Sequence, residues 1–427
     1  MTKDIVKQMV ADRRHLHQHP EEGWLEFETT WYVVSRLKSL GFEVAIGTDV
    51  IAESSVMGRD PEAVEHAKTR AISHGIPGEF IESTHGYTGA MGVWKTGRQG
   101  PVTALRFDID CLPIEETKDP NHVPNREGFR SEYPGVSHAC GHDAHTAVGL
   151  GVAAWVAQHA DELCGTIKLL FQPAEEGVRG AAAMAARGIV DDVDWFAGAH
   201  IGCSAAKHQV GVSHHGYLAT TKFDLELTGM PCAAGSPEQG RSALMCGASL
   251  CLSLGSLPGH SQGISRVQIG KFISGTARNI IAGHALMLLE VRGETTEINN
   301  YMAANVERTV DGIARAYGVD YSLKRVGEAV TYRGDEEAVA LIKEAAADVP
   351  TVSSVVDMNA KVGSEDCTVL IRRVQQHGGK AVFFYFGCEH HGHHKPDFDV
   401  QDTETLQDGF GVFTGFLQRT NGSKRTS

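Results

Sequence analysis

The chain has 427 residues, of which 42% are hydrophobic and 22% charged, a composition typical of globular proteins rather than of disordered, collagenous or coiled-coil chains. At one domain per roughly 150 residues, this length predicts two or three domains. The net charge of −14 argues against nucleic acid and anionic membranes as main partners, because both require a basic surface.

Neither the hydrophobic runs nor the N-terminus indicates a membrane or secreted protein. The longest apolar runs, such as residues 285–289 and 381–386, fall far below the roughly 18 residues that a membrane span needs. Residues 1–14 mix acidic and basic side chains and lack the apolar segment of a secretory signal. The nine cysteines are odd in number and scattered, unlike a disulfide framework. We therefore expect a cytoplasmic protein.

The first half of the chain alternates helical and strand patterns. Residues 28–40 carry apolar side chains at helical spacing, and the continuous apolar run 102–107 is typical of a buried strand. The other predicted elements are a strand at 42–44, a helix at 146–159, a strand at 167–171, a helix at 180–187 and a strand at 196–201. This alternation predicts an α/β fold with a largely parallel sheet, whose functional residues gather at the carboxyl ends of the strands.

The pattern changes between residues 217 and 328. Residues 222–228 alternate apolar and polar side chains, as a half-exposed strand does. The predicted elements that follow are a helix at 242–256, strands at 266–271 and 286–292, a helix at 297–317 and a strand at 321–325. This βαββαβ order is that of the ferredoxin-like split motif, so we expect a separate, inserted domain.

The C-terminal third returns to the α/β pattern of the first half. Its predicted elements are helices at 336–347 and 365–375, a strand at 381–386 and a helix at 403–416. We therefore expect a discontinuous catalytic domain, formed by residues 1–216 and 329–427, that is interrupted by an inserted domain at 217–328.

Side chains that bind metals lie at the ends of several predicted elements. Cys140 and His142 precede a predicted helix, whereas Glu176, His200 and His394 each end or follow a predicted strand. Each motif alone also fits a structural role, as a helix-start loop, a solvated acidic pair or a buried histidine. Cys, His and carboxylate are nevertheless the ligands that borderline divalent metals prefer. Together the five residues predict a metal site where the strand ends meet.

Three further carboxylates complete the predicted chemistry. Glu175 precedes Glu176 and points in a different direction, so it can act as a general base on water while its neighbour binds metal. Two ions about 4 Å apart polarise a carbonyl and lower the pKa of bridging water. Asp108 and Asp110 follow the strand at 102–107 and are predicted to orient ligating imidazoles, although a simple turn is an equal alternative.

Seven motifs carry a resemblance that extends from about Arg13 to Gln407. They are RRHLHQHPE (13–21), RFDIDCLPI (106–114), HACGHDAH (138–145), PAEEG (173–177), GAH (198–200), GSED (363–366) and the late His-His-x-Pro (393–396). With them the chain resembles the amidohydrolase branch of the dinuclear aminoacylase and carboxypeptidase metallopeptidases. The segments ESSVMG (53–58) and ATTKFD (219–224), with a helical insertion between Arg59 and Tyr87, add a resemblance to the hydrolases of p-aminobenzoyl-glutamate.

The resemblance implies a fold, a cofactor and substrate contacts. The fold is a zinc-peptidase-like mixed sheet flanked by helices, with a ferredoxin-like lid that dimerises. The cofactor is two divalent metal ions per subunit, manganese in preference to zinc. Asn279 and Arg292 of the lid match the residues that hold the carboxylate of the leaving amino acid. Arginine suits bidentate binding of a carboxylate better than lysine.

The resemblance also implies a reaction, for which alternatives remain. The expected reaction is hydrolysis of an N-aroyl or N-acyl amino acid, above all p-aminobenzoyl-glutamate to p-aminobenzoate and glutamate. A general N-acyl-amino-acid hydrolase of the hippurate type is the first alternative. A low-activity binding or assembly subunit that needs a partner chain is the second. The expected assembly is a homodimer through the lid, or a heteromer with a related B-type subunit.

The lid departs from the family pattern at one position. The family usually has a lid histidine that stabilises the tetrahedral intermediate in the neighbouring subunit, and Ala233 stands where that residue would fall. Loss of one such donor typically lowers the rate by about 100- to 1000-fold. His214, His215 and His260 are candidates for a compensating group.

Overall fold

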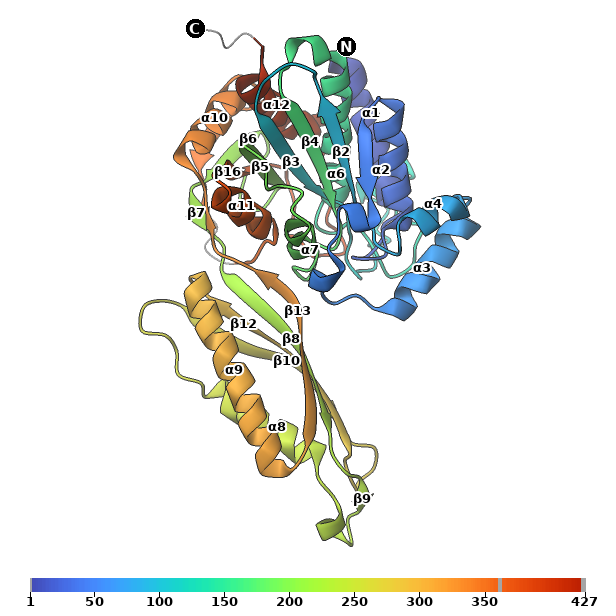
Figure 1. The fold of residues 1–427 in the computed structure, drawn as a ribbon. Coiled ribbons are helices and arrows are strands. Elements are labelled where there is room, and N and C mark those ends of the chain that lie inside the picture. The colour runs from blue at the N-terminus through green and yellow to red at the C-terminus, as the bar shows by residue number, and fades with distance from the viewer. Residues whose placement is uncertain (1, 360–362, 424–427) are drawn as a thin grey trace. The chain divides into compact units, whose positions relative to one another are not determined.

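The computed structural model describes residues 2–359 and 363–423, which form two compact units (Figure 1). The first unit runs to Gly216 and takes up the chain again from Tyr332, and the second comprises Tyr217–Thr331 and a short segment ending at Glu365. Where the chain leaves and re-enters the first unit, β7 (His215–Gly216) pairs with β14 (Tyr332–Arg333). None of the described helices combines the length and the apolar composition that crossing a membrane requires.

The first unit is built on an eight-stranded mixed sheet. Its strands, in spatial order, are β1 (Glu43–Ile46), β2 (Ala90–Lys95), β4 (Thr166–Gln172), β3 (Val102–Asp108), β5 (Trp195–Ile201), β16 (Lys380–Phe386), β6 (Gln209–Ser213) and β15 (Ser354–Asp357). The four central strands β4, β3, β5 and β16 are parallel to one another. The flanking pairs β1–β2, β2–β4 and β16–β6 are antiparallel. The largely parallel arrangement predicted from the sequence thus applies to the centre of the sheet.

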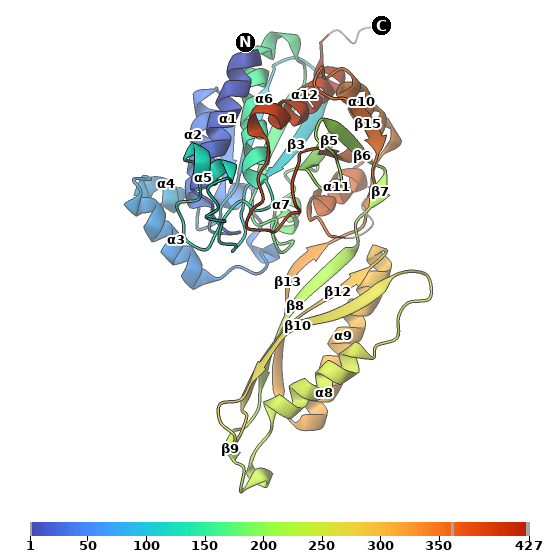
Figure 2. The same cartoon turned by 180° about the vertical axis from the view of Figure 1, so that it is seen from behind.

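Helices cover both faces of this sheet (Figures 1 and 2). On one face lie α1 (Thr2–Gln18), α2 (Phe27–Ser39), α6 (His142–Gln158), α10 (Glu336–Ala347) and α12 (Asp402–Asn421). On the other lie α7 (Ala181–Ala186) and α11 (Cys367–Gln376). The insertion between Arg59 and Tyr87 forms α3 (Pro61–Ser73) and α4 (Gly78–Ser83), and α5 (Val123–Glu127) is a single turn.

Helix α6 is almost completely buried because it is packed between the sheet and other helices. Gly149 allows the close approach to β3, since an added Cβ would lie 2.7 Å from the ring of Phe107. The helix begins at His142, directly after Gly141, whose φ of 89° is favourable only for glycine. The N-terminus of α6 is thereby held beside the carboxyl ends of the central strands.

The second unit has the element order βαββαβ. Its elements are β8 (Ala219–Thr228), α8 (Ala243–Gly255), β10 (Ser265–Ser274), β12 (His284–Gly293), α9 (Thr296–Tyr317) and β13 (Asp320–Ala329). The strands form an antiparallel sheet in the order β10-β12-β8-β13, and both helices pack on one of its faces (Figure 2). Alternate residues of β12 are buried against them, as the period of a strand requires. A small ribbon of β9 (Cys232–Ala233) and β11 (Ile280–Ile281) lies beside this sheet.

Candidate metal centre

The predicted metal ligands of the first unit come together at the carboxyl edge of the four central strands. Cys140 and His142 stand at the start of α6, and Glu176 lies in the loop after β4. His200 belongs to β5, and His394 lies in the loop after β16. Parallel strands end at one edge of a sheet, so residues far apart in the sequence meet there.

The ligand atoms lie at distances that a metal ion could bridge. Sγ of Cys140 is 3.4 Å from Nε2 of His200, and Nε2 of His142 is 3.9 Å from Oε1 of Glu176. Nε2 of His394 is 3.5 Å from the same Glu176 oxygen. Cys140, Glu176 and His394 form one group whose ligand atoms all lie within 4.8 Å of one another.

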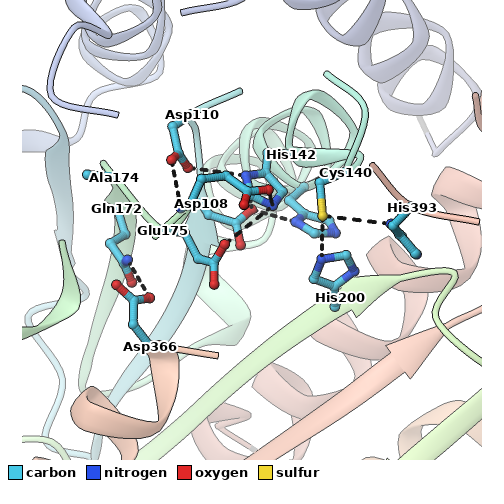
Figure 3. A network of polar contacts seen from close by, with 12 residues as sticks. Asp108, Asp110, Cys140, His142, Gln172, Ala174, Glu175, His200, Asp366 and His393 are labelled. Carbon is cyan, nitrogen blue, oxygen red and sulfur yellow. Dashed lines mark hydrogen bonds and ion pairs between the residues drawn. The ribbon is translucent and has the colours of Figure 1, made fainter. Parts of the chain in front are cut away.

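Glu175 is directed into the same cluster. Its Oε2 lies 3.9 Å from Nε2 of His142, and its carboxylate points towards that imidazole in Figure 3. His142, Glu175 and Glu176 form a second group of close ligand atoms. The two glutamates therefore face one locus from a single loop, as the roles of base and ligand require.

The polar atoms of this cluster fit a divalent cation. Nε2 of His142 and Oε1 of Glu176 are buried and make no hydrogen bond to the described residues. Burying polar atoms without partners is costly, so these two indicate a ligand between them. Burial and the nearby charges of Glu176 and Glu175 raise the pKa of the Cys140 thiol well above its usual value. A bound cation would reverse this effect by stabilising the thiolate.

The histidines of the cluster differ in their electrostatic environments. Burial alone would lower the pKa of His142, but the carboxylates of Asp108 and Asp110 outweigh it and raise this pKa to about 10. Burial, followed by the neighbouring imidazole of His145, lowers the pKa of His200 well below its usual value. His200 is thus neutral and able to coordinate a metal, and the surroundings of His142 favour positive charge.

The two aspartates after β3 support the cluster in different ways. Asp110 accepts a hydrogen bond from Nδ1 of His142 at 3.2 Å and another from the backbone N–H of Glu176 at 2.8 Å. Asp108 lies 3.8 Å from His142 and makes its shortest contact, of 2.5 Å, with Nδ1 of His145. Nε2 of His145 in turn accepts from the backbone of Ile201, beside His200. Asp110 therefore touches two predicted ligands directly, whereas Asp108 acts through His145.

The loop that carries Glu175 and Glu176 has an unusual backbone. Ala174 and Val178 have positive φ angles of 52° and 58°, and Gly177 between them has 86°. A left-handed conformation costs an alanine or valine roughly 1–2 kcal/mol, so the surrounding structure must hold this loop in place. Part of that support comes from Asp366, which accepts hydrogen bonds from the backbone of Gly180 and Ala181, at the end of the loop.

Sequence reasoning missed two groups of residues around the centre. Nδ1 of His393 lies 3.7 Å from Sγ of Cys140, a contact for which the histidine-rich stretch gave a signal but no choice among its members. Beneath α6, His17 bonds to Asp143, which also receives a hydrogen bond from Arg13. The motif RRHLHQHPE contained this signal, but contacts over more than 100 residues cannot be read from spacing.

The predicted substrate contacts belong to the second unit. Arg292 lies on β12, where its Nε donates to Glu290 at 2.7 Å. The backbone oxygen of Asn279 accepts from the N–H of Ala234, next to Ala233. Asn279 and the position of the missing histidine thus lie side by side within this unit.

Two of the candidate compensating histidines make other contacts. Nε2 of His214 lies 2.9 Å from Oδ1 of Asp357, in the first unit. The ring of His260 packs edge-on against Tyr301, with the ring centres 5.1 Å apart, in the second. These contacts occupy both side chains.

Comparisons with known proteins identify related hydrolases. The sequence model of peptidase family M20/M25/M40 matches residues 104–419. A p-aminobenzoyl-glutamate hydrolase homolog from Haemophilus influenzae is 41% identical over 97% of this chain and 98% of its own. An indole-3-acetyl-aspartic acid hydrolase from Enterobacter agglomerans is 42% identical over 94% of this chain and 93% of its own.

Solved structures agree with these relatives. An aminobenzoyl-glutamate utilization protein from Klebsiella pneumoniae, 36% identical, has a TM-score of 0.84 over 98% of this chain and 96% of its own. The Bacillus subtilis YXEP protein, described as a dinuclear metal-binding peptidase of the M20 family, is 25% identical, with a TM-score of 0.66 over 97% of this chain and 98% of its own. The match of the family model and the relatives at about 40% identity lead to one conclusion: the chain belongs to peptidase family M20/M25/M40 and is a metal-dependent hydrolase.

Proposed function

We propose that this chain hydrolyses the amide bond of an N-aroyl amino acid, and that its substrate is p-aminobenzoyl-glutamate. The convergence of Cys140, His142, Glu176, His200 and His394 around Glu175 is the observation that carries this proposal. Relatives of about 40% identity named for p-aminobenzoyl-glutamate support the choice of substrate.

In this proposal the five ligands hold two divalent ions, manganese in preference to zinc. The ions would polarise the scissile carbonyl and lower the pKa of water towards neutrality. Glu175 accepts a proton from the attacking water and delivers it to the leaving amine. Asp110 keeps the imidazole of His142 and the backbone of Glu176 in place during this reaction.

The second unit takes the role of a ferredoxin-like lid at residues 217–328, between catalytic segments 1–216 and 329–427. Asn279 and Arg292 of the lid bind the carboxylate of the leaving glutamate, for which the planar guanidinium of Arg292 is suited. We further propose that the lid forms a homodimer, or a heteromer with a related B-type subunit, and that the protein is cytoplasmic.

One alternative substrate has a specific observation in its favour. The relative from Enterobacter agglomerans is named for indole-3-acetyl-aspartic acid, which is also an aryl acid joined to an acidic amino acid. Both substrates place a second carboxylate on the leaving group. The amino acid half would therefore be shared, and the aryl half would distinguish the two activities.

The test is hydrolysis by the purified full chain, loaded with manganese. The substrates are p-aminobenzoyl-glutamate, indole-3-acetyl-aspartate, benzoyl-glycine and several N-acetyl amino acids, with the released amino acid as the readout. We expect the highest kcat/KM for p-aminobenzoyl-glutamate. Preference for benzoyl-glycine or the acetyl compounds would indicate a general N-acyl hydrolase. Silence across the panel, with manganese bound, would favour a binding subunit that needs a partner chain.

A further inference from the structure

Glu26 is a buried acid that neither the ligand set nor the catalytic base includes. It stands at the N-cap position of α2, yet its side chain makes no capping hydrogen bond to that helix. The residue is fully buried, with 0% of its surface exposed. A buried carboxyl group needs hydrogen-bond partners, so the contacts of its two oxygens indicate its role.

The two oxygens of Glu26 have different partners. Oε1 accepts a hydrogen bond of 2.8 Å from the backbone N–H of Ala174, and Oε2 accepts one of 2.6 Å from the hydroxyl of Thr88. Ala174 is the residue directly before Glu175 and has a φ of 52°. Gly23 packs against the same residue, since a Cβ on Gly23 would lie 2.8 Å from the Cα of Ala174. Glu26 therefore holds the one peptide group that determines where the chain enters the Glu175 turn.

Each part of the loop is held by a different buried carboxyl group. Glu26 binds the N–H of Ala174 at its start, Asp110 binds the N–H of Glu176 in its middle, and Asp366 binds the N–H of Gly180 and Ala181 at its end. The Asp110 and Asp366 anchors lie after Glu175 in the chain. The Glu26 anchor alone of these three lies before it, so its loss should affect the base more than the neighbouring ligand.

We infer that Glu26 is a positioning residue for Glu175, and that it acts by accepting the N–H of Ala174 through a neutral carboxyl group. The inference rests on the proposed role of Glu175 as general base. Burial, followed by the negative charge of Asp110, raises the pKa of Glu26 to about 8, so the group is largely protonated at neutral pH. A glutamine has the shape and the hydrogen-bonding pattern of a protonated glutamate, with one oxygen for Ala174 and one N–H₂ group for Thr88.

The test compares Glu26→Leu with Glu26→Gln in the full chain. A displacement of about 1 Å at a catalytic group can cost about 100-fold in rate. We expect Glu26→Leu to lower kcat by 10- to 100-fold, with KM and bound manganese unchanged. Glu26→Gln should keep kcat within about threefold of the wild-type value. The peptide that covers residues 172–181 should exchange its amide hydrogens faster in Glu26→Leu than in Glu26→Gln, as measured by mass spectrometry.

Glu21→Leu is the matched control for the loss of a buried carboxylate. Glu21 is 1% exposed, and its side chain accepts hydrogen bonds from the backbone N–H of Thr29, on the same helix α2, and from Arg70 on α3. This variant should lower the unfolding temperature and leave kcat and the exchange of 172–181 unchanged. An unchanged kcat in Glu26→Leu, an equal loss in Glu26→Gln, or an equal loss in Glu21→Leu would overturn the inference. An inactive wild type with the expected exchange pattern would overturn the proposed function and leave the anchoring of the loop supported.

Discussion

At the scale of single residues, Cys140 offers a direct test of the ligand set. Its thiol lies 3.4 Å from His200 and is buried, so replacement by serine removes a soft ligand without opening a large cavity. We expect Cys140→Ser to bind less manganese per chain, as measured by elemental analysis after dialysis. Cys246→Ser, which changes a buried thiol of the second unit, should bind as much metal as the wild type. Equal metal content in both variants would remove Cys140 from the ligands.

His17 predicts how stability depends on pH. Burial and the charge of Arg13 lower its pKa, but the carboxylates of Asp143 and Glu116 outweigh both and raise it from 6.5 to about 9. Because the pKa is higher in the folded state, the stabilisation is complete below pH 6.5 and is lost as the pH rises through 9. The difference corresponds to about 3 kcal/mol.

The measurement is the free energy of unfolding of the wild type and of His17→Asn at pH 6.5 and pH 9. The wild type should lose stability over this interval, and the variant should lose distinctly less. An equal loss in both proteins would show that His17 is not the titrating group.

The residues of the candidate site differed in how far the sequence revealed them. Cys140, Glu176 and His200 could be identified because ligand chemistry coincides with the ends of predicted elements. Glu26 could not, because its partner Ala174 is 148 residues away and the contact is made to a backbone N–H. His393 and His394 were ambiguous, since adjacent histidines in a loop have no periodicity that distinguishes them.

At the scale of secondary-structure elements, strong periodicity led to correct predictions and short or shielded elements were missed. Helix α9 was predicted at 297–317 and spans Thr296–Tyr317, because its apolar stripe is long and regular. Strands β2, β6 and β15 were not predicted, because four to six residues carry too little pattern. The antiparallel pairing of β6 with β16 makes the sheet mixed, and pairing direction depends on tertiary contacts rather than on local sequence.

The ribbon of β9 and β11 allows a test of the missing lid histidine. Ala233 pairs with Ile280 and is exposed, so a larger side chain fits there without repacking a core. We expect Ala233→His to raise kcat at least tenfold, because one donor to a developing oxyanion is worth about 100- to 1000-fold in rate. Ala234→His, at the neighbouring exposed position, should have no such effect. Equal rates for the wild type and Ala233→His would indicate that another group already supplies the donor.

At the scale of the whole molecule, exposed apolar side chains of the second unit predict self-association. Leu252 on α8 is 80% exposed and Ile273 on the edge strand β10 is 54% exposed. An open sheet edge with apolar side chains favours pairing with another chain. We expect a dimer in sedimentation velocity and a shift towards monomer for Ile273→Lys. Ile72→Lys, which changes an equally exposed isoleucine of α3 in the first unit, should remain dimeric.

The central claim is that Glu175 moves protons and Glu176 binds metal. The measurement that tests it most directly is kcat, together with bound manganese per chain, for the wild type, Glu175→Gln and Glu176→Gln. We predict that Glu175→Gln keeps its metal and loses turnover by at least 100-fold, within the range typical of a lost general base. Glu176→Gln should lose metal as well as turnover. Loss of metal from Glu175→Gln, or turnover close to that of the wild type, would contradict the assignment.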